Sequence, residues 1–215
     1  MTRVLHGYFR SSAAYRVRIA LNLKGLDYER VSVHLRKGEQ RADAFLALNP
    51  QGMVPALVDG DALLTQSPAI LEYLDEAYPD TPPLLPDGAV DRARVRALAA
   101  AVACDIPPLN NLRVLQYIQG PLGCSQEAMA TWYNHWIAEG FRALERMLAD
   151  DPRTGRFCHG DAPGLADVCL VPQVFNSARH ALDLAPYPTI RRIAEACNAL
   201  EAFQDAHPSR QPDAE

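Results

Sequence analysis

Hydrophobic and polar positions follow two different patterns along the chain. In the first part, short apolar stretches of strand type alternate with stretches whose apolar residues recur at helical spacing. Apolar positions from Ser12 onward keep a helical period up to Gly25, which stands where a glycine commonly ends a helix. The full series predicts strand, helix, strand, helix, two strands joined by an Asp59-Gly60 turn, and helix, over residues 4–9, 12–24, 28–35, 41–49, 54–66 and 67–78.

This order predicts a small mixed sheet flanked by helices. Two strands joined by a helix are expected to be parallel, with a right-handed crossover, and the hairpin adds an antiparallel edge. The proline-rich stretch 78–88 predicts a linker. Beyond it strand signals stop, and helical patterns cover residues 91–106, 126–149, 164–182 and 188–203. We therefore expect an α/β domain at 1–81 and an all-helical domain at 88–215, with Pro107 and Pro108 kinking a helix.

Composition narrows the class of protein. Of 215 residues, 48% are hydrophobic and 22% are charged, as in globular proteins. The net charge of -5 is spread along the chain, so we expect no nucleic-acid partner. The beginning "MTRVLHGYFR" lacks the apolar core of a signal peptide, and no apolar run reaches the roughly 18 residues of a membrane span. From these two observations we expect a cytoplasmic protein. The five cysteines show no metal-binding spacing, so we expect no metal site.

Two serines, Ser11 and Ser12, stand at the turn from the first strand into the first helix. A serine there commonly caps the helix. The same place also suits a thiolate, because a helix N-terminus carries free N–H groups and about half a positive charge. The serines are therefore candidates both for capping and for holding an anionic sulfur.

Six segments, in order, resemble the zeta class of the glutathione transferases, which includes maleylacetoacetate isomerases. They are "RSSAAYRVRIALNLKGLDYE", "ALNPQGMVPALVDG", "LTQSPAILEYLDE", "PPLNNLRVL", "LADVCLVPQVFN" and "DLAPYPTI". The likeness covers essentially the whole chain. It implies a thioredoxin-like domain of order βαβαββα followed by a helical bundle, glutathione as cofactor, and a homodimer.

The resemblance also implies roles for individual residues. Ser11 is expected to hydrogen-bond the glutathione sulfur, with Ser12 beside it, and the Val54-Pro55 bond is expected to be cis and to present Val54 to the cysteinyl backbone. Gln66 and Ser67 would bind the γ-glutamyl carboxylate at a helix N-terminus, and Gln40 the glycine end. The expected glutathione contacts are Ser11, Ser12, Arg16, Gln40, Val54, Pro55, Gln66, Ser67 and Asn111.

Three arginines are candidates for binding a dicarboxylate substrate. A planar guanidinium suits a carboxylate, although a lone arginine is most often a solvated surface charge. Arg10 directly precedes the serines, Arg179 matches an active-site arginine of the family, and Arg113 matches an arginine of relatives that isomerise maleylpyruvate. Helical spacing turns Arg16 and Arg18 away from the apolar stripe and predicts solvated or ion-paired side chains, although Arg16 also belongs to the matched motif.

The resemblance implies glutathione-dependent cis-trans isomerisation of maleylacetoacetate to fumarylacetoacetate, with Ser11, Ser12 and Arg10 as catalytic residues. Maleylpyruvate, a shorter diacid, is an alternative substrate that Arg113 favours. Glutathione transfer or dehalogenation acting on small haloacids is a second alternative. A non-catalytic binding module is a third, and it would be expected to lack Ser11 or the Gln66-Ser67 pair, which are all present.

Overall fold

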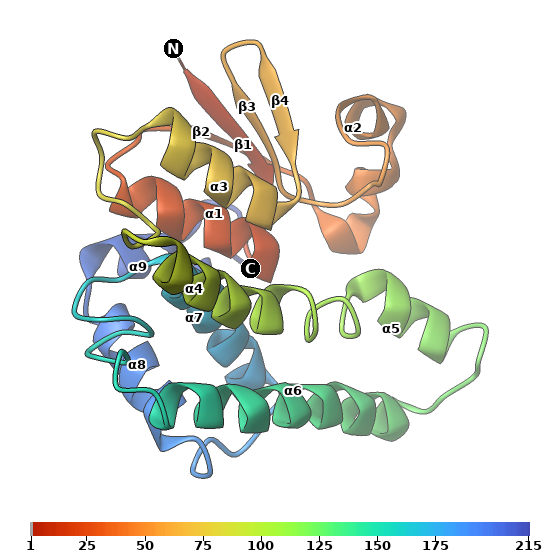
Figure 1. Ribbon diagram of the computed structural model, residues 1–215. Helices are drawn as coiled ribbons and strands as arrows, with labels where there is room; N and C mark the ends of the chain where they lie inside the picture. The colour runs from red at the N-terminus through yellow and green to blue at the C-terminus, as the bar shows by residue number, and fades with distance from the viewer. Residues whose placement is uncertain (1) are drawn as a thin grey trace. The chain divides into compact units, whose positions relative to one another are not determined.

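A four-stranded sheet forms the centre of the first of two structural units (Figure 1). The computed structural model describes residues 2–215, and its first unit holds the chain up to Leu84 together with Ala199–Glu215. The strands lie in the order β2-β1-β3-β4, with β1 parallel to β2 and antiparallel to β3, and β3 antiparallel to β4. Their bounds are Arg3–Gly7 for β1, Glu29–Ser32 for β2, Ala56–Asp59 for β3 and Ala62–Thr65 for β4.

Three α-helices accompany the sheet between its strands and after them. They are α1 (Ser12–Leu23), α2 (Asp43–Leu48) and α3 (Ser67–Ala77), with short 3-10 turns η1 (Leu35–Lys37) and η2 (Glu39–Arg41) before α2. The predicted element order and the parallel strand pair are thus confirmed. Gly25 has a φ of 64°, the left-handed conformation that glycine adopts readily after a helix. The hairpin turn is one residue later than predicted, since Asp59 pairs with Ala62 across Gly60 and Asp61.

The first unit also contains the end of the chain. Helix α9 (Glu201–Ala206) packs on α1, and the 3-10 turn η3 (Pro208–Arg210) follows it. The division into domains 1–81 and 88–215 therefore differs from the structural units at the C-terminus. The difference arises because α9 buries Phe203 and Ala206 in the first unit, whereas the sequence pattern joined residues 188–203 into one helix.

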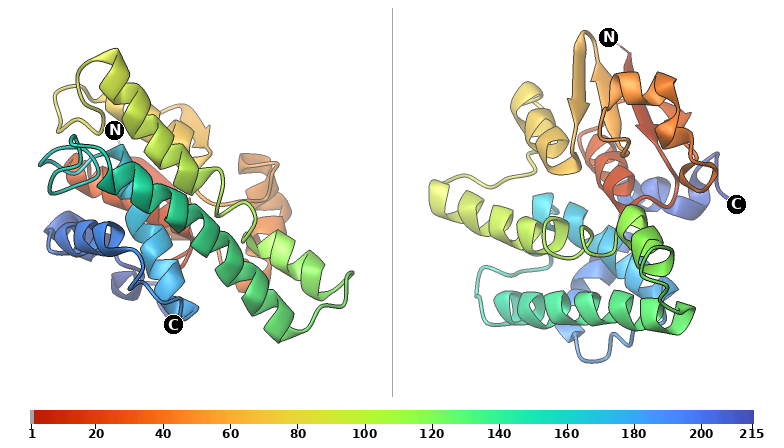
Figure 2. Two further views of the ribbon diagram at one scale, coloured as in Figure 1. Left: turned by 60° about the horizontal axis from the view of Figure 1, so that its bottom comes forward. Right: turned by 90° about the vertical axis from the view of Figure 1, so that its right-hand side faces the viewer.

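The second unit, Leu85–Asn198, is all-helical. It contains α4 (Ala89–Ala103), α5 (Leu112–Gln119), α6 (Gln126–Ala149), α7 (Leu165–Arg179) and α8 (Pro188–Asn198). Figure 2 shows the long α6 running beside α4, and α7 contacts both α4 and α8. The predicted kink at Pro107 and Pro108 is wrong. Helix α4 ends at Ala103, before the two prolines, which have no backbone N–H to continue the helix, and α5 begins only at Leu112. None of the helices within residues 2–215 combines the length and hydropathy that crossing a bilayer requires.

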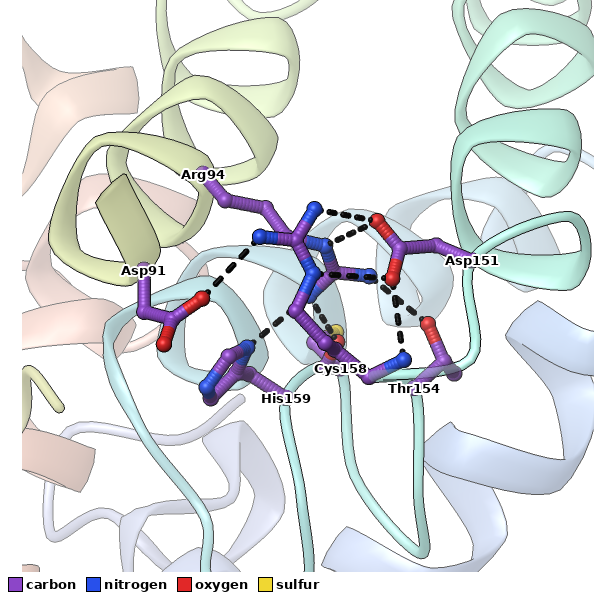
Figure 3. Close-up of polar contacts among 7 residues, drawn as sticks. Asp91, Arg94, Asp151, Thr154, Cys158 and His159 are labelled. Atoms are coloured by element: carbon purple, nitrogen blue, oxygen red, sulfur yellow. Dashed lines mark hydrogen bonds and ion pairs between the residues drawn. The ribbon is translucent and has the colours of Figure 1, made fainter.

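An arginine of α4 ties this helix to the loop after α6 (Figure 3). Arg94 donates from Nε to Asp151 at 2.8 Å, from Nη2 to the Thr154 hydroxyl at 2.8 Å and from Nη1 to the carbonyl of Cys158 at 2.8 Å. Arg153 adds a bond to Asp91 at 3.0 Å. A charged donor with three acceptors is well suited to a partly buried place, so this network holds the helical unit together.

Candidate active site

Ser11 caps the helix that it precedes. Its extended backbone and its hydroxyl oxygen, which accepts from the Ala14 N–H at 3.2 Å, make it the N-cap of α1, and the Ser11 N–H closes a turn on the Tyr8 carbonyl at 3.0 Å. The cap uses an oxygen lone pair, so the hydroxyl proton stays available for donation. All residues of the first turn of α1 are described by the structure, and none of them is an acidic residue that would offset the positive end of the helix dipole. Capping and thiolate binding are therefore compatible, and Ser12 begins the helix beside it.

An apolar cluster connects this turn to the predicted cis proline. The Val54-Pro55 peptide bond is cis, as expected. Val54 lies in one cluster with Tyr8, Phe9, Val33 and Phe45, so the side chains that precede Ser11 and the residue before Pro55 rest on the same support. Among residues 2–215, no backbone hydrogen bond satisfies the N–H or the carbonyl of Val54. Both groups can therefore pair with an extended peptide.

The N-terminus of α3 forms a second place for an anion. Gln66 has a φ of 66°, a strained value for a residue with a side chain, and strain of this kind concentrates at ligand clamps. Its side chain does not cap α3 but donates to Gln51 Oε1 at 2.6 Å, so the helix begins without a side-chain cap. Arg16 donates from Nη1 to the Ser67 hydroxyl at 3.2 Å. Free N–H groups and a guanidinium thus come together where a carboxylate is expected.

Gln40 supplies a further polar group in the same unit. It lies in η2, where the sequence predicted a loop, and its side chain is buried, with 9% of the residue exposed. Its Oε1 atom is buried without a hydrogen-bond partner among residues 2–215. A buried amide oxygen of this kind costs free energy unless a donor reaches it. The uncapped α3, the open Val54 backbone and this oxygen together fit a peptide with an anionic end.

Arg10 is held next to the serine turn by aromatic side chains. Its Nη2 donates to the Tyr8 hydroxyl at 3.2 Å, and its guanidinium lies 4.9 Å from the centre of the Phe9 ring. These contacts fix one side of the guanidinium and leave the remaining N–H groups for a carboxylate. Sequence reasoning missed Tyr8 as the residue that orients Arg10; its place two residues before the arginine is the signal that was available.

Arg18 corrects one prediction. The sequence predicts a solvated or ion-paired side chain, but Arg18 is 3% exposed and donates to backbone carbonyls, because both α9 and α3 pack on α1. Its Nη2 donates to the Phe9 carbonyl at 2.9 Å and its Nε to the Ala206 carbonyl at 3.0 Å. Arg16, at 2% exposed, is buried as well. Both charges are buried on polar partners, so the helical spacing misjudged a helix that is covered on more than one face.

The remaining predicted residues belong to the helical unit. Asn111 is the N-cap of α5, its Oδ1 accepting from the Arg113 N–H at 3.2 Å, and the Arg113 side chain is exposed. Arg179 is exposed at the end of α7, with its guanidinium 6.0 Å from the Phe175 ring centre. Burial raises the pKa of Tyr133 to about 12, and the positive charge of Arg179 opposes that rise.

Other side chains do not form a metal site. Within the described part of the chain, no three His, Cys, Asp or Glu side chains gather in a way that could hold a metal ion. The chemistry of the site is therefore that of hydroxyl, amide, guanidinium and backbone groups.

Comparisons with known proteins agree with this chemistry. Residues 5–82 match the family described as "Glutathione S-transferase, N-terminal domain" and residues 127–203 its C-terminal domain. The chain is 53% identical over 209 residues to the maleylpyruvate isomerase of Ralstonia sp., covering 97% of this chain and 98% of that protein. It is 50% identical over 212 residues to the maleylacetoacetate isomerase of Pseudomonas aeruginosa, covering 97% of each.

Solved structures give the same result. A holo maleylpyruvate isomerase, described as a bacterial zeta-class glutathione S-transferase, superposes with a TM-score of 0.96 at 52% identity, covering 99% of this chain and 100% of that one. A maleylacetoacetate isomerase of Methylobacterium extorquens AM1, with bound malonate and glutathione, also reaches 0.96 at 47% identity and 99% coverage of both chains.

Proposed function

The chain belongs to the zeta class of the glutathione S-transferase family, and from this premise we propose that it isomerises maleylacetoacetate to fumarylacetoacetate with glutathione as its cofactor. The observation that carries the proposal is the Ser11 turn: a hydroxyl with its proton available stands at the uncompensated N-terminus of α1. Relatives with about half of their residues identical over nearly the full length carry the names of such isomerases. The same relatives support a small diacid as substrate.

The residues of the first unit suit the binding of glutathione. We propose that Gln66, Ser67 and the N-terminus of α3 bind the γ-glutamyl carboxylate, with Arg16 orienting the Ser67 hydroxyl. The unpaired backbone groups of Val54, before Pro55, would bind the cysteinyl backbone. Gln40 would bind the glycine end, its buried Oε1 accepting from the glycyl N–H, and Asn111 of the helical unit is proposed as a further contact.

Bound glutathione supplies the thiolate that adds to the maleyl double bond and leaves after the resulting single bond has rotated. Ser11 stabilises this thiolate by donating a hydrogen bond from its hydroxyl. The amide dipoles of α1 also stabilise the thiolate and so lower the thiol pKa further. Ser12, the first residue of α1, stands beside it. Since the thiolate is regenerated in each turnover, the protein has to position and stabilise charge rather than react covalently itself.

Arginines are proposed to hold the substrate carboxylates. Arg10 is positioned by Tyr8 and Phe9 next to the serine turn, so it would bind the carboxylate nearest to the reacting carbons. Arg113 and Arg179 are exposed cations of the helical unit, and the family resemblance supports them as further carboxylate-binding residues.

Maleylpyruvate is the second candidate substrate. Arg113 supports this substrate because the family resemblance matches it to an arginine of relatives that isomerise maleylpyruvate, and the Ralstonia relative that is 53% identical carries the name of a maleylpyruvate isomerase. Initial rates with both diacids at a range of concentrations decide between them, through the ratio of their kcat/KM values.

The decisive experiment separates isomerisation from glutathione consumption. The enzyme is mixed with substrate and a small fraction of that amount of glutathione, with the protein scarcer still, and NMR follows the cis and trans diacids while a thiol assay follows glutathione. An isomerase converts all of the substrate and leaves the thiol unchanged. Conversion that stops after one equivalent of glutathione, with thiol lost in proportion, would contradict the proposal and favour conjugation or dehalogenation of small acids.

We further propose a cytoplasmic homodimer with a glutathione-binding domain at 1–81 and a helical domain at 88–215, whose last residues, from Ala199 on, pack in the first structural unit. The family resemblance supports the dimer, and the sequence pattern supports the domain division. Light scattering coupled to size exclusion measures the mass, and a mass of one chain at working concentration would contradict the dimer.

A further inference from the structure

The last nine residues form an ordered segment, which we call the C-terminal strap (residues 207–215). It begins with η3, and Gln211, at 5% exposed, anchors it. The side-chain Nε2 of Gln211 donates to the backbone carbonyls of Asp205 at 2.8 Å and His207 at 2.9 Å. The backbone carbonyl of Gln211 accepts from the Ala214 N–H at 3.0 Å. The carboxylate of Asp213, between these anchored residues, is therefore presented by a folded turn.

The strap reaches the loop that leads into the serine turn. Asp213 Oδ2 accepts from the Phe9 N–H at 3.1 Å and from the Ser32 hydroxyl at 3.0 Å. On its other side, the Phe9 carbonyl accepts from Arg18, which also donates to the Ala206 carbonyl. The backbone N–H of Phe9 is thus bonded to Asp213, and its carbonyl to Arg18, which is itself bonded to Ala206. The C-terminal segment lies beside β1 and α1 (Figure 2).

Phe9 determines where Ser11 stands. It lies two residues before Ser11 in the turn that the Ser11 N–H closes on the Tyr8 carbonyl, and its ring lies under the Arg10 guanidinium. Rotation of the peptide before Phe9 would therefore move the turn, the Ser11 hydroxyl and the arginine together. The negative charge of Asp213 is opposed by buried Arg18, whose pKa burial lowers to about 10 while Asp213 acts to raise it.

We propose that Asp213 is a positioning residue for catalysis, which acts through the Phe9 N–H to aim the Ser11 hydroxyl and the N-terminus of α1 at the glutathione thiolate. The inference rests on the proposed glutathione-dependent isomerase function. It assigns a role in the reaction to a residue 204 positions away from the loop that it holds. Asp213 needs only its acceptor oxygen for this role, and its charge is secondary.

The test compares four variants of the full chain. Asp213→Ala removes the acceptor, and Asp213→Asn keeps an acceptor oxygen without the charge. Glu215→Gln is the matched control, because it weakens the strap's exposed contacts with His34 and Arg36 and leaves Asp213 in place. Asp213 is only partly buried and lies near the chain end, so its variants should fold. If the alanine variant does not fold, Asp213→Ser replaces it, because the shorter serine side chain does not reach the Phe9 N–H.

Three measurements are made on each variant. Amide hydrogen exchange in the free protein reports whether the Phe9 N–H is still bonded. The ultraviolet absorbance of the thiolate, titrated with pH, gives the pKa of bound glutathione. Steady-state kinetics with a maleyl diacid separate kcat from the KM for glutathione.

We expect Asp213→Ala to speed Phe9 exchange, to raise the pKa of the bound thiol and to lower kcat about 10- to 100-fold, with the KM for glutathione nearly unchanged. Asp213→Asn and Glu215→Gln should stay close to the original protein in all three.

Two results would overturn the inference: an alanine variant with unchanged thiol pKa and kcat, or equal losses in the alanine, asparagine and glutamine variants. If the unmodified protein itself does not lower the thiol pKa or does not isomerise, the proposed function fails instead. The two failures are therefore distinguishable.

Discussion

Replacing Ser11 by alanine tests two roles of one hydroxyl, the cap of α1 that the structure shows and the donation to a thiolate that we propose. The structure gives the first role a magnitude, because the bond from the Ala14 N–H to Ser11 Oγ is the side-chain cap of α1, and losing such a cap costs about 1 kcal/mol of the free energy of unfolding. The second role is donation to the thiolate. Removing one preorganised donor costs about 2–4 kcal/mol of transition-state stabilisation, which corresponds to a loss of about 30- to 900-fold in kcat/KM.

Glycine at the same position provides the comparison. Glycine is tolerated at a helix N-cap at a cost of only a few tenths of a kcal/mol, so Ser11→Gly should unfold in urea close to the original midpoint while losing as much activity as Ser11→Ala. Ser12→Ala is the second control, since Ser12 is the first residue of α1 and does not cap it. The measurements are urea unfolding, the pKa of bound glutathione and kcat/KM with a maleyl diacid. A near-normal rate for both Ser11 variants, together with an inactive Ser12→Ala, would refute the assignment and transfer the donor role to Ser12.

Two further predictions concern the carboxylate-binding groups. Gln66→Gly should relieve a backbone strain of about 1–3 kcal/mol, so the urea midpoint of unfolding should rise. The KM for glutathione should also increase, because the backbone that holds the carboxylate becomes more flexible. A lower urea midpoint would show that the Gln66 conformation is unstrained. Arg10→Met and Arg179→Met keep their apolar stems and should retain the fold by circular dichroism while kcat/KM falls; Arg113→Ser should impair maleylpyruvate more than maleylacetoacetate, and equal losses would contradict its bias toward the shorter acid.

Local patterns were sufficient for most of the fold. The element order from β1 to α3 follows from periodicity and turn signals, and α6 has the bounds that its helical pattern predicts. The errors occur where two local rules compete. The helical pattern of apolar residues runs over 91–106, yet Pro107 and Pro108 cannot donate the next backbone bonds, and α4 ends early, at Ala103.

The charged and strained residues of the site were harder to judge. Helical spacing assigns Arg18 to a polar face, but burial depends on how many neighbours cover a helix, and α9 is supplied by a distant part of the chain. The left-handed backbone of Gln66 has no local signal, because glutamine rarely adopts it and tertiary contacts impose it. The family resemblance located Gln66, whereas the physical reason for its place became visible only in the structure.

The contacts that support the serine turn are the most distant in sequence. Arg16 reaches Ser67 across 51 positions, and Asp213 reaches Phe9 across 204. No periodicity or spacing rule relates residues so far apart, and an aspartate near a chain end is by itself typical of a solvated tail. A hydroxyl misplaced by about 1 Å already loses much of its effect on a rate. On the proposals made above, the serine motif would specify the chemistry, and the distant contacts made by Asp213 and Arg16 would set the accuracy of its position.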